Sequence, residues 1–136
     1  MLKKYSCITC SKLIEAYTER IYCSLKCQND KKYKDFISNW KKGIVDGMRG
    51  KTSTSGHIRR YLFEKYNNGC SECGWSKTNQ YTGKIPLELE HIDGNYKNNE
   101  EKNLKLLCSN CHSLTATWKG ANKKEGRPRS KYYRGT

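Results

Sequence analysis

An acidic residue and a histidine stand side by side in the chain as Glu90 and His91, and a second histidine, His112, follows further on. A neutral histidine is the natural base near pH 7 and can activate a water molecule. A carboxylate with one further neutral ligand can hold a divalent ion such as Mg²⁺ and leave positions open for phosphate oxygens and water. The set therefore contains the groups needed for metal-assisted hydrolysis of a phosphodiester.

Two questions about these residues stay open in the sequence. Glu88 lies on the same predicted strand face as Glu90 and is therefore an alternative acid ligand. Strict alternation along a strand also sends Glu90 and His91 to opposite faces, so both reach one phosphate only if the strand twists or breaks there. Further along, the amide of Asn103 is placed to pin the backbone of the intervening loop.

The eight cysteines form closely spaced pairs. Thiolates two or three residues apart can converge on one ion, and two such pairs complete a tetrahedral zinc shell. We predict two structural zinc ions, because a catalytic zinc normally keeps an open coordination position. The two sets are Cys7, Cys10, Cys23 and Cys27, and Cys70, Cys73, Cys108 and Cys111. Structural disulfides in an exported protein remain an alternative, as does His112 in place of a cysteine in the second shell.

The elements that position these residues follow from the hydrophobic pattern. Apolar and acidic residues alternate up to His91, which predicts a half-buried strand. The polar run to Lys102 predicts a loop too long for a tight hairpin, and residues 104–107 a second strand. A helix is expected from Cys111 through Trp118, with Gly120 as its C-terminal stop.

Earlier in the chain, residues 17–22 suit a short hairpin, and Ser24 can cap a helix that begins near Leu25. Residues 28–42 are polar and basic, with an aromatic and apolar stripe of helical spacing that favours a packing face. Residues 51–56 have the Thr, Ser and Gly composition of a linker, where we place a domain boundary. Ser55 can cap a further helix from His57 to Tyr66.

Composition limits the classes of protein. With 136 residues and a hydrophobic fraction of 35%, against roughly 45 to 50% in ordinary globular domains, we expect a small core stabilised by metal. Lys and Arg number 27 against 13 acids, and the net charge of +14 favours a polyanionic partner, first of all nucleic acid. No apolar run approaches the roughly 20 residues that span a bilayer. Residues 1–9 lack the apolar region of a secretory signal, which predicts a reducing interior.

Residues 89–113 read LEHIDGNYKNNEEKNLKLLCSNCHS and resemble the HNH, or ββα-metal, endonucleases, including small homing endonucleases and phage nucleases. On this resemblance His91 corresponds to the family's general-base histidine, Asn103 to its middle asparagine and His112 to its last histidine. Glu90 stands where the family commonly has Asp or His, which keeps a carboxylate but lengthens its reach. The resemblance covers about half of the chain, residues 61–126.

The resemblance implies a nuclease in which His91 activates water while a divalent ion on Glu90 and His112 stabilises the transition state and the 3′-oxygen leaving group. We therefore predict an α+β fold of zinc-stabilised domains. These are a four-cysteine finger over 1–30, a basic helix and linker over 31–56, a ββα-metal core over 57–121 and a basic tail over 122–136. The expected function is cleavage or nicking of double-stranded DNA with Mg²⁺ or a similar ion, by a homing-type or phage nuclease. The rivals are a non-catalytic zinc-finger DNA-binding or regulatory protein and an RNA-acting protein.

Basic side chains around and after the predicted core suit contact with the DNA backbone. They are Arg59, Arg60, Lys119, Lys123, Lys124, Arg127 and Arg129. An unspecific solubilising role is the alternative for the tail. We expect the cytoplasm of a bacterial host or phage-infected cell as the location and no membrane partner, and a homodimer remains open.

Overall fold

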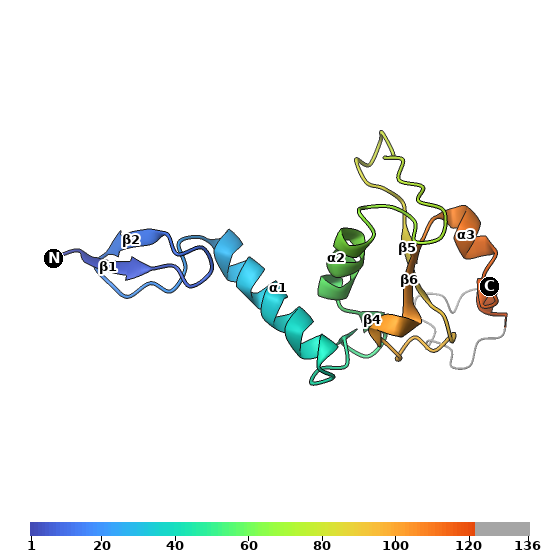
Figure 1. Cartoon of the computed structure of the whole chain (residues 1–136), viewed down its shortest axis with the longest axis horizontal. Helices are drawn as coiled ribbons and strands as arrows, with labels where there is room; N and C mark the ends of the chain where they lie inside the picture. Colours follow the sequence, from blue (N-terminus) through green and yellow to red (C-terminus); the bar gives the residue numbers. More distant parts are fainter. Residues whose placement is uncertain (122–136) are drawn as a thin grey trace, which may run out of the picture. The chain divides into compact units, whose positions relative to one another are not determined.

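The computed structural model describes residues 1–121, which form a small α+β protein (Figure 1). The chain divides into two compact units, Met1–Asn39 and Trp40–Thr136. This division lies earlier than the boundary expected at residues 51–56, because those residues fold with the second unit. The basic tail at 122–136, with Lys123, Lys124, Arg127 and Arg129, lies outside the described residues.

The first unit opens with the antiparallel strands β1 (Lys3–Ser6) and β2 (Leu13–Ala16). The turn between them is closed by two backbone hydrogen bonds, from Cys7 N to Lys12 O (2.9 Å) and from Ser11 N to Cys7 O (2.8 Å). The hairpin expected at residues 17–22 is wrong, since that segment contains no strand. It bonds instead to the cysteine turn, through Ile8 N and Ile21 O at 3.1 Å.

Helix α1 (Leu25–Lys41) begins where the sequence predicts. The Ser24 hydroxyl accepts from Cys27 N at 3.2 Å, and its carbonyl accepts from Gln28 N at 3.1 Å, so Ser24 caps the helix as expected. The predicted packing stripe is confirmed at Tyr33 and Trp40, whose side chains are buried.

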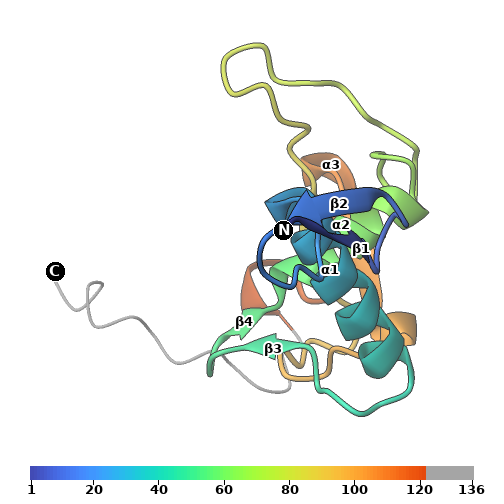
Figure 2. The same ribbon diagram turned by 90° about the vertical axis from the view of Figure 1, so that its left-hand side faces the viewer.

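The second unit contains a short hairpin in place of the expected linker. Strand β3 (Met48–Arg49) pairs with β4 (Ser53–Thr54), in the register Met48 to Thr54 (Figure 2). Gly50 supplies the left-handed backbone of the turn, with φ of +64°. A bond from Ser55 N to Gly47 O at 2.8 Å closes the base of the hairpin, so this Thr, Ser and Gly segment is ordered by pairing rather than flexible.

Helix α2 (Gly56–Lys65) follows directly and confirms the helix expected there. Ser55 is its N-cap and accepts from His57 N at 3.2 Å. Ile58 and Leu62 have no exposed surface and form the centre of the core. The helix is followed by two asparagines in the left-handed region, Asn67 and Asn68, and then by a long loop that leads to β5 (Figures 1 and 2).

The site is carried by the antiparallel strands β5 (Glu88–His91) and β6 (Leu104–Leu107), with His91 opposite Leu104. A 3₁₀ turn, Glu101–Asn103, precedes β6. Helix α2 contacts β6, and α3 (Ser109–Ser113) contacts both strands, so the two helices flank the pair (Figure 1). This is the predicted order of strand, loop, strand and helix.

The last helix is shorter than expected. It ends at Ser113, and a separate 3₁₀ turn, Trp118–Gly120, follows. The expected helix from Cys111 through Trp118 is therefore wrong. The hydroxyl of Thr115 bonds to His112 O at 2.9 Å, and β-branched threonines have weak helix propensity, so the chain turns here. Among residues 1–121 no helix is long and apolar enough to cross a membrane.

Candidate active site and metal centres

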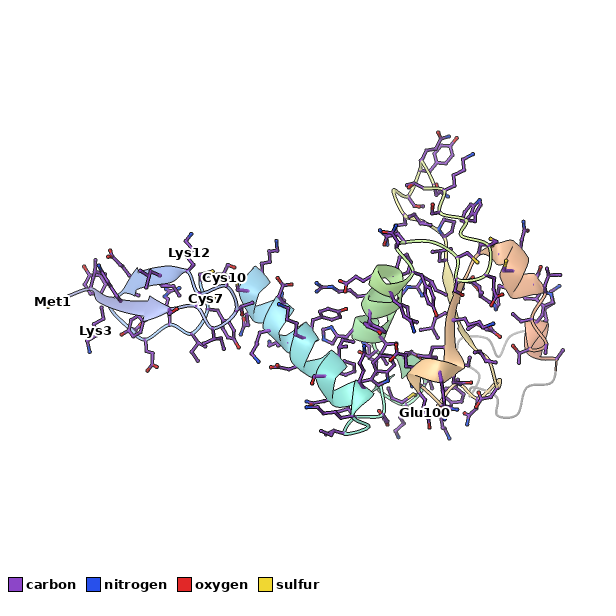
Figure 3. All side chains as sticks on the ribbon, in the orientation of Figure 1. Met1, Lys3, Cys7, Cys10, Lys12 and Glu100 are labelled. Atoms are coloured by element: carbon purple, nitrogen blue, oxygen red, sulfur yellow. The ribbon has the colours of Figure 1, made fainter. Side chains whose placement is uncertain are left out.

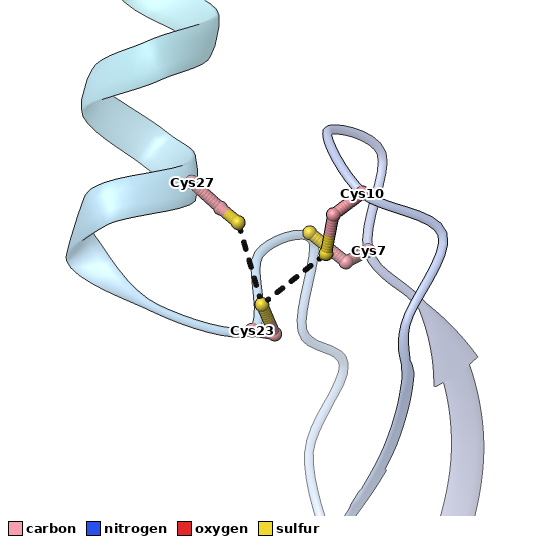
Figure 4. A group of neighbouring side chains, drawn as sticks. All are labelled: Cys7, Cys10, Cys23 and Cys27. Atoms are coloured by element: carbon pink, nitrogen blue, oxygen red, sulfur yellow. Dashed lines mark hydrogen bonds between the residues drawn. The ribbon is translucent and has the colours of Figure 1, made fainter.

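The first cysteine cluster is assembled by the β1–β2 turn and the start of α1. Cys7 and Cys10 lie at the turn end of the hairpin (Figure 3). The Cys23 sulfur lies 3.6 Å from that of Cys10 and 3.4 Å from that of Cys27 (Figure 4). The four sulfurs lie within 4.8 Å of one another, so they can hold one metal ion.

The second cluster joins segments that are distant in the sequence. Cys70 and Cys73 follow α2, whereas Cys108 and Cys111 lie at the start of α3. The Cys73 and Cys108 sulfurs are 3.7 Å apart, and all four sulfurs again lie within 4.8 Å of one another. A bond from Ser71 N to Leu106 O at 2.8 Å fastens the first pair to β6. A metal ion here would therefore tie the end of α2 to the strands and α3.

The distances between the sulfurs distinguish zinc binding from disulfide formation. All eight are free thiols, so the disulfide alternative is not what the structure contains. Four thiolates arranged tetrahedrally around zinc, with Zn–S near 2.3 Å, stand about 3.8 Å apart. The sulfur–sulfur separations of 3.4 to 3.7 Å in the two clusters are close to that value.

The pKa values of the cysteine thiols also favour a bound cation in a cluster. Burial raises the pKa of the Cys70 thiol, but backbone hydrogen bonds from Cys108 and Cys73 outweigh it, and the pKa falls to about 6. The Cys7 thiol has the same shift, to about 6. In contrast, the neighbouring Cys73 thiol raises the pKa of Cys111 to about 12. The second cluster therefore favours one thiolate and opposes a further one at Cys111, unless a positive ion lies among the sulfurs.

His112 lies between two carboxylates from β5. Its Nε2 is 3.0 Å from Glu90 Oε2, and its Nδ1 is 2.6 Å from Glu88 Oε2. Glu88 and Glu90 thus share a strand face, as alternation predicts. The Glu90 side chain is 10% exposed and that of Glu88 is 59% exposed. His112 is therefore engaged by the acids and does not replace a cysteine in the second cluster, which is complete without it.

The environment of Glu90 keeps its carboxylate in place. The Thr117 hydroxyl donates a hydrogen bond to it. The Trp118 ring meets the His112 ring edge-on at 5.1 Å and restricts that imidazole from another side. A cavity of about 330 Å³ adjoins Glu90 and is also lined by Lys105. Glu90 and His112 Nε2 together present an oxygen and a nitrogen that could serve as two ligands for a divalent ion.

Glu88 has a different relation to such an ion. Since Glu88 and Glu90 bond to different nitrogens of His112, the three residues do not offer one ligand atom each to a single point. Metal-ligating histidines usually donate their second ring N–H to a carboxylate, which fixes the tautomer and the ring orientation. Glu88 on Nδ1 and Glu90 on Nε2 fit this arrangement, in which an ion at Nε2 would lie beside Glu90 and Glu88 would lie behind the imidazole.

His91 points to the other face of β5. Its side chain is buried, and its Nε2 donates to Asn99 Oδ1 at 2.8 Å. Within residues 1–121 it forms no hydrogen bond with Glu90 or His112. The strand neither breaks nor twists enough to bring these groups into contact. His91 with Asn99 therefore lies on one face of β5, and Glu90 with His112 lies on the other.

Asn99 is held by contacts from three directions and is buried. The hydroxyl of Thr54 donates to its Oδ1 at 3.0 Å, and its own amide donates to Met48 Sδ at 3.0 Å. The indole of Trp40 donates to its backbone carbonyl at 2.7 Å. Because an amide oxygen can only accept a hydrogen bond, the contact of Nε2 with Asn99 Oδ1 places the His91 proton on Nε2. The lone pair of a neutral His91 is then on Nδ1.

Asn103 makes the loop contact expected of it. Its Oδ1 accepts from Asp93 N at 3.0 Å, and its amide donates to Asp93 Oδ1 at 2.9 Å and to Asn98 O at 2.8 Å. These bonds join both ends of the loop between β5 and β6. Asn103 therefore supports the loop next to the site, and within residues 1–121 it forms no hydrogen bond with Glu88 or Glu90.

The predicted DNA contacts have different surroundings. Arg59 donates to Leu87 O at 2.7 Å, and Arg60 pairs with Glu64 at 2.9 Å, so part of the Arg60 charge is neutralised. The Lys119 ammonium lies 5.8 Å from the Trp118 ring centre. The other predicted contacts belong to the tail outside the described residues.

Sequence reasoning missed Asn99 and the role of Glu88 behind His112. Asn98 and Asn99 have the composition of turn residues, which hides the second of them. One signal was present, since alternation placed His91 on the inner face of the strand, where a buried imidazole needs a polar partner. The partner itself is set by the path of the loop.

The chain is 55% identical over 53 residues to the H-N-H endonuclease F-TflIV of Escherichia phage T5. The match covers 39% of this chain, and the chain spans only 22% of the length of that curated relative. No family model and no solved structure matches the chain. The resemblance to HNH endonucleases inferred from residues 89–113 is thereby confirmed, and it extends over part of the chain.

Proposed function

We propose that this chain is a divalent-metal-dependent HNH endonuclease that hydrolyses phosphodiester bonds in double-stranded DNA, of the homing or phage type. The observation that carries the proposal is the pairing of Glu90 with His112 at the strand where His91 is held by Asn99. The similarity to a phage H-N-H endonuclease supports the same reaction. The protein would act in the cytoplasm of a bacterial host or phage-infected cell, where its substrate lies.

Glu90 and His112 would hold the catalytic ion, Mg²⁺ or a similar cation. Such an ion supplies charge stabilisation for the phosphate and the leaving oxygen. Glu88 bonds to Nδ1 of His112 and orients the ring, so that Nε2 and the Glu90 carboxylate would be the ligands of the ion. The Thr117 hydroxyl orients the Glu90 carboxylate by a hydrogen bond.

His91 would remove a proton from the attacking water through Nδ1. Asn99 selects this tautomer by accepting from Nε2, and burial keeps the imidazole oriented. Since His91 and Glu90 lie on opposite faces of β5, the scissile phosphate would lie beside that strand, within reach of both. Asn103 keeps the loop that carries Asn99 closed.

Zinc in the two cysteine clusters would be structural. Each cluster supplies four sulfurs, which complete a tetrahedral shell and leave no open position for a substrate. Arg59, Lys119 and the basic tail would contact the DNA backbone. Binding should then weaken steeply with salt, because each neutralised phosphate releases counterions.

The test is incubation of supercoiled plasmid with the full chain and Mg²⁺, Mn²⁺ or Ni²⁺, beside a matched duplex RNA. Nicked or linear plasmid with intact RNA is expected. If the chain binds DNA but cleaves it with none of these ions, the proposal of an endonuclease is wrong and a zinc-finger DNA-binding protein is favoured. Preferential cleavage of the RNA would instead show that the substrate is RNA.

Glu90→Gln and Glu88→Gln should have effects of different size, since both remove a charge from the same strand face without changing side-chain length. We expect Glu90→Gln to reduce cleavage by on the order of 10³-fold, because it removes a ligand. Glu88→Gln should raise the Mg²⁺ concentration needed for half-maximal rate by about 10-fold, because it loosens the His112 ring. Metal titrations of the cleavage rate measure both, and a larger loss for Glu88→Gln would reverse the two assignments.

Asn99→Ala should reduce kcat by about 10- to 100-fold with little change in KM, as is usual when a buried partner of a catalytic group is removed. Asn99→Asp keeps the acceptor for His91 Nε2 and should recover part of the rate. ¹⁵N NMR of the His91 imidazole provides a readout other than stability. In Asn99→Ala the imidazole should no longer be held in the single Nε2–H tautomer. An unchanged tautomer together with a lower Tm would mean that Asn99 acts only in folding.

A further inference from the structure

A groove of about 630 Å³ lies between the β3–β4 hairpin, the first turn of α2 and the start of β5. It is separate from the cavity beside Glu90, with which it shares no lining residue. Its lining is polar and basic: Arg49, Ser53, Thr54, Ser55, Gly56, Arg59, Glu88 and Leu89.

The charges in this groove favour an anion. Within residues 1–121 neither Arg49 nor Arg59 forms an ion pair with a carboxylate. Arg59 uses one nitrogen on Leu87 O, at 2.7 Å, which positions the guanidinium and leaves its other N–H groups available. The only acid in the lining, Glu88, is bonded to His112 Nδ1 at 2.6 Å. The two arginines therefore share the groove with a carboxylate that already has a partner.

The backbone adds further positive potential. Helix α2 begins at Ser55 and Gly56 in the wall of the groove, where the helix dipole favours negative charge. A side-chain carbon at Gly56 would meet nothing within 4 Å, so the first turn of the helix is open to a ligand. The Ser53 side chain is exposed in the same wall and adds a hydroxyl donor.

The groove touches both halves of the candidate active site. Glu88 lines it and also holds His112, which belongs to the face of β5 with Glu90. Thr54 lines it and also donates to Asn99, which holds His91 on the other face. A strand of DNA with its scissile phosphate beside β5 would therefore continue into this groove.

We propose that this groove binds a phosphate of the DNA backbone next to the scissile one, through Arg49 and Arg59. The proposal rests on the proposed function and deepens it by naming the path of the cut strand. Arginine forks bind phosphate oxygens in a bidentate manner, which fixes the strand as well as attracting it. The subsite would set the register of the backbone relative to Glu90 and His91.

The test measures binding of a duplex oligonucleotide to the zinc-loaded full chain, without added Mg²⁺, as a function of salt. Arg49→Ala is the main variant, because the Arg49 side chain forms no hydrogen bond or ion pair within residues 1–121. The slope of log K against log salt should fall by about 1 for Arg49→Ala and by about 2 for Arg49→Ala/Arg59→Ala. Arg49→Lys should restore most of the slope.

Lys102→Ala is the matched control, since it removes one exposed positive charge outside the groove. Its slope should stay near that of the wild type. An equal fall for Lys102→Ala, or an unchanged slope for Arg49→Ala, would overturn the subsite. Plasmid cleavage by the wild type, measured in parallel, tests the proposed nuclease activity separately. If Arg49→Ala reduces the slope but the wild type does not cleave plasmid, the groove binds phosphate and the proposed nuclease activity is wrong.

Discussion

His91→Ala is expected to lose about 10²- to 10⁴-fold in the rate of DNA cleavage, the range usual for removal of a general base. The variant should still bind Mg²⁺ and DNA, because His91 forms no hydrogen bond with Glu90 or His112 within the described residues and lies on the other face of β5. Single-turnover cleavage of a labelled duplex measures the chemical step, and filter binding measures affinity. Added imidazole should restore part of the rate.

His57→Ala provides the histidine control. His57 lies at the start of α2, where its backbone N–H donates to the Ser55 side chain. It is not one of the hydrogen-bond or ion-pair partners of His91 and His112 described above. Its removal should leave the cleavage rate within about 2-fold of the wild type, as is usual for a substitution away from a site. Equal rates for the wild type and His91→Ala would contradict the assignment of the base, even if both proteins cleave.

Cys108→Ser is expected to unfold the second unit, the largest effect on stability that we foresee. Binding of structural zinc contributes about 10 to 16 kcal/mol in small zinc domains, far more than the usual total stability of a domain. Here the metal would replace a large apolar core, since the hydrophobic fraction is only 35%. Circular dichroism and zinc analysis should show lost structure and one zinc ion per chain in place of two.

Cys23→Ser is the informative control for this experiment. Cys23 belongs to the first unit, Met1–Asn39, whereas the candidate active site belongs to the second. We expect Cys23→Ser to lose one zinc ion and to retain cleavage of plasmid at a reduced affinity for DNA. Ser109→Ala, next to Cys108 and exposed, should melt like the wild type. A fully folded Cys108→Ser protein with one zinc ion would show that the second cluster is not what stabilises its unit.

Local chemistry made several features predictable. Ser24 and Ser55 each precede a helix, and a side-chain oxygen there satisfies free backbone N–H groups regardless of the rest of the fold. The cysteine spacing likewise predicts both clusters, because close pairs on one turn already point toward a common centre. Prediction was wrong at residues 17–22 and 51–56, where backbone partners outside each segment decide the conformation. It was also wrong at residues 114–118, where the Thr115 hydroxyl bonds to His112 O and threonine has weak helix propensity.

The amino-acid sequence alone identifies the candidate site residues and predicts that Glu90 and His91 face opposite ways, because the two-residue period of a strand is a local property. How those residues are held depends on contacts that form only in the folded chain. Asn99 receives the Trp40 indole across 59 residues of sequence and the Thr54 hydroxyl across 45. Glu88 and Glu90 divide the two nitrogens of His112 between them only because α3 packs on β5. Such contacts depend on the path of the whole chain, and no local pattern of residues encodes them.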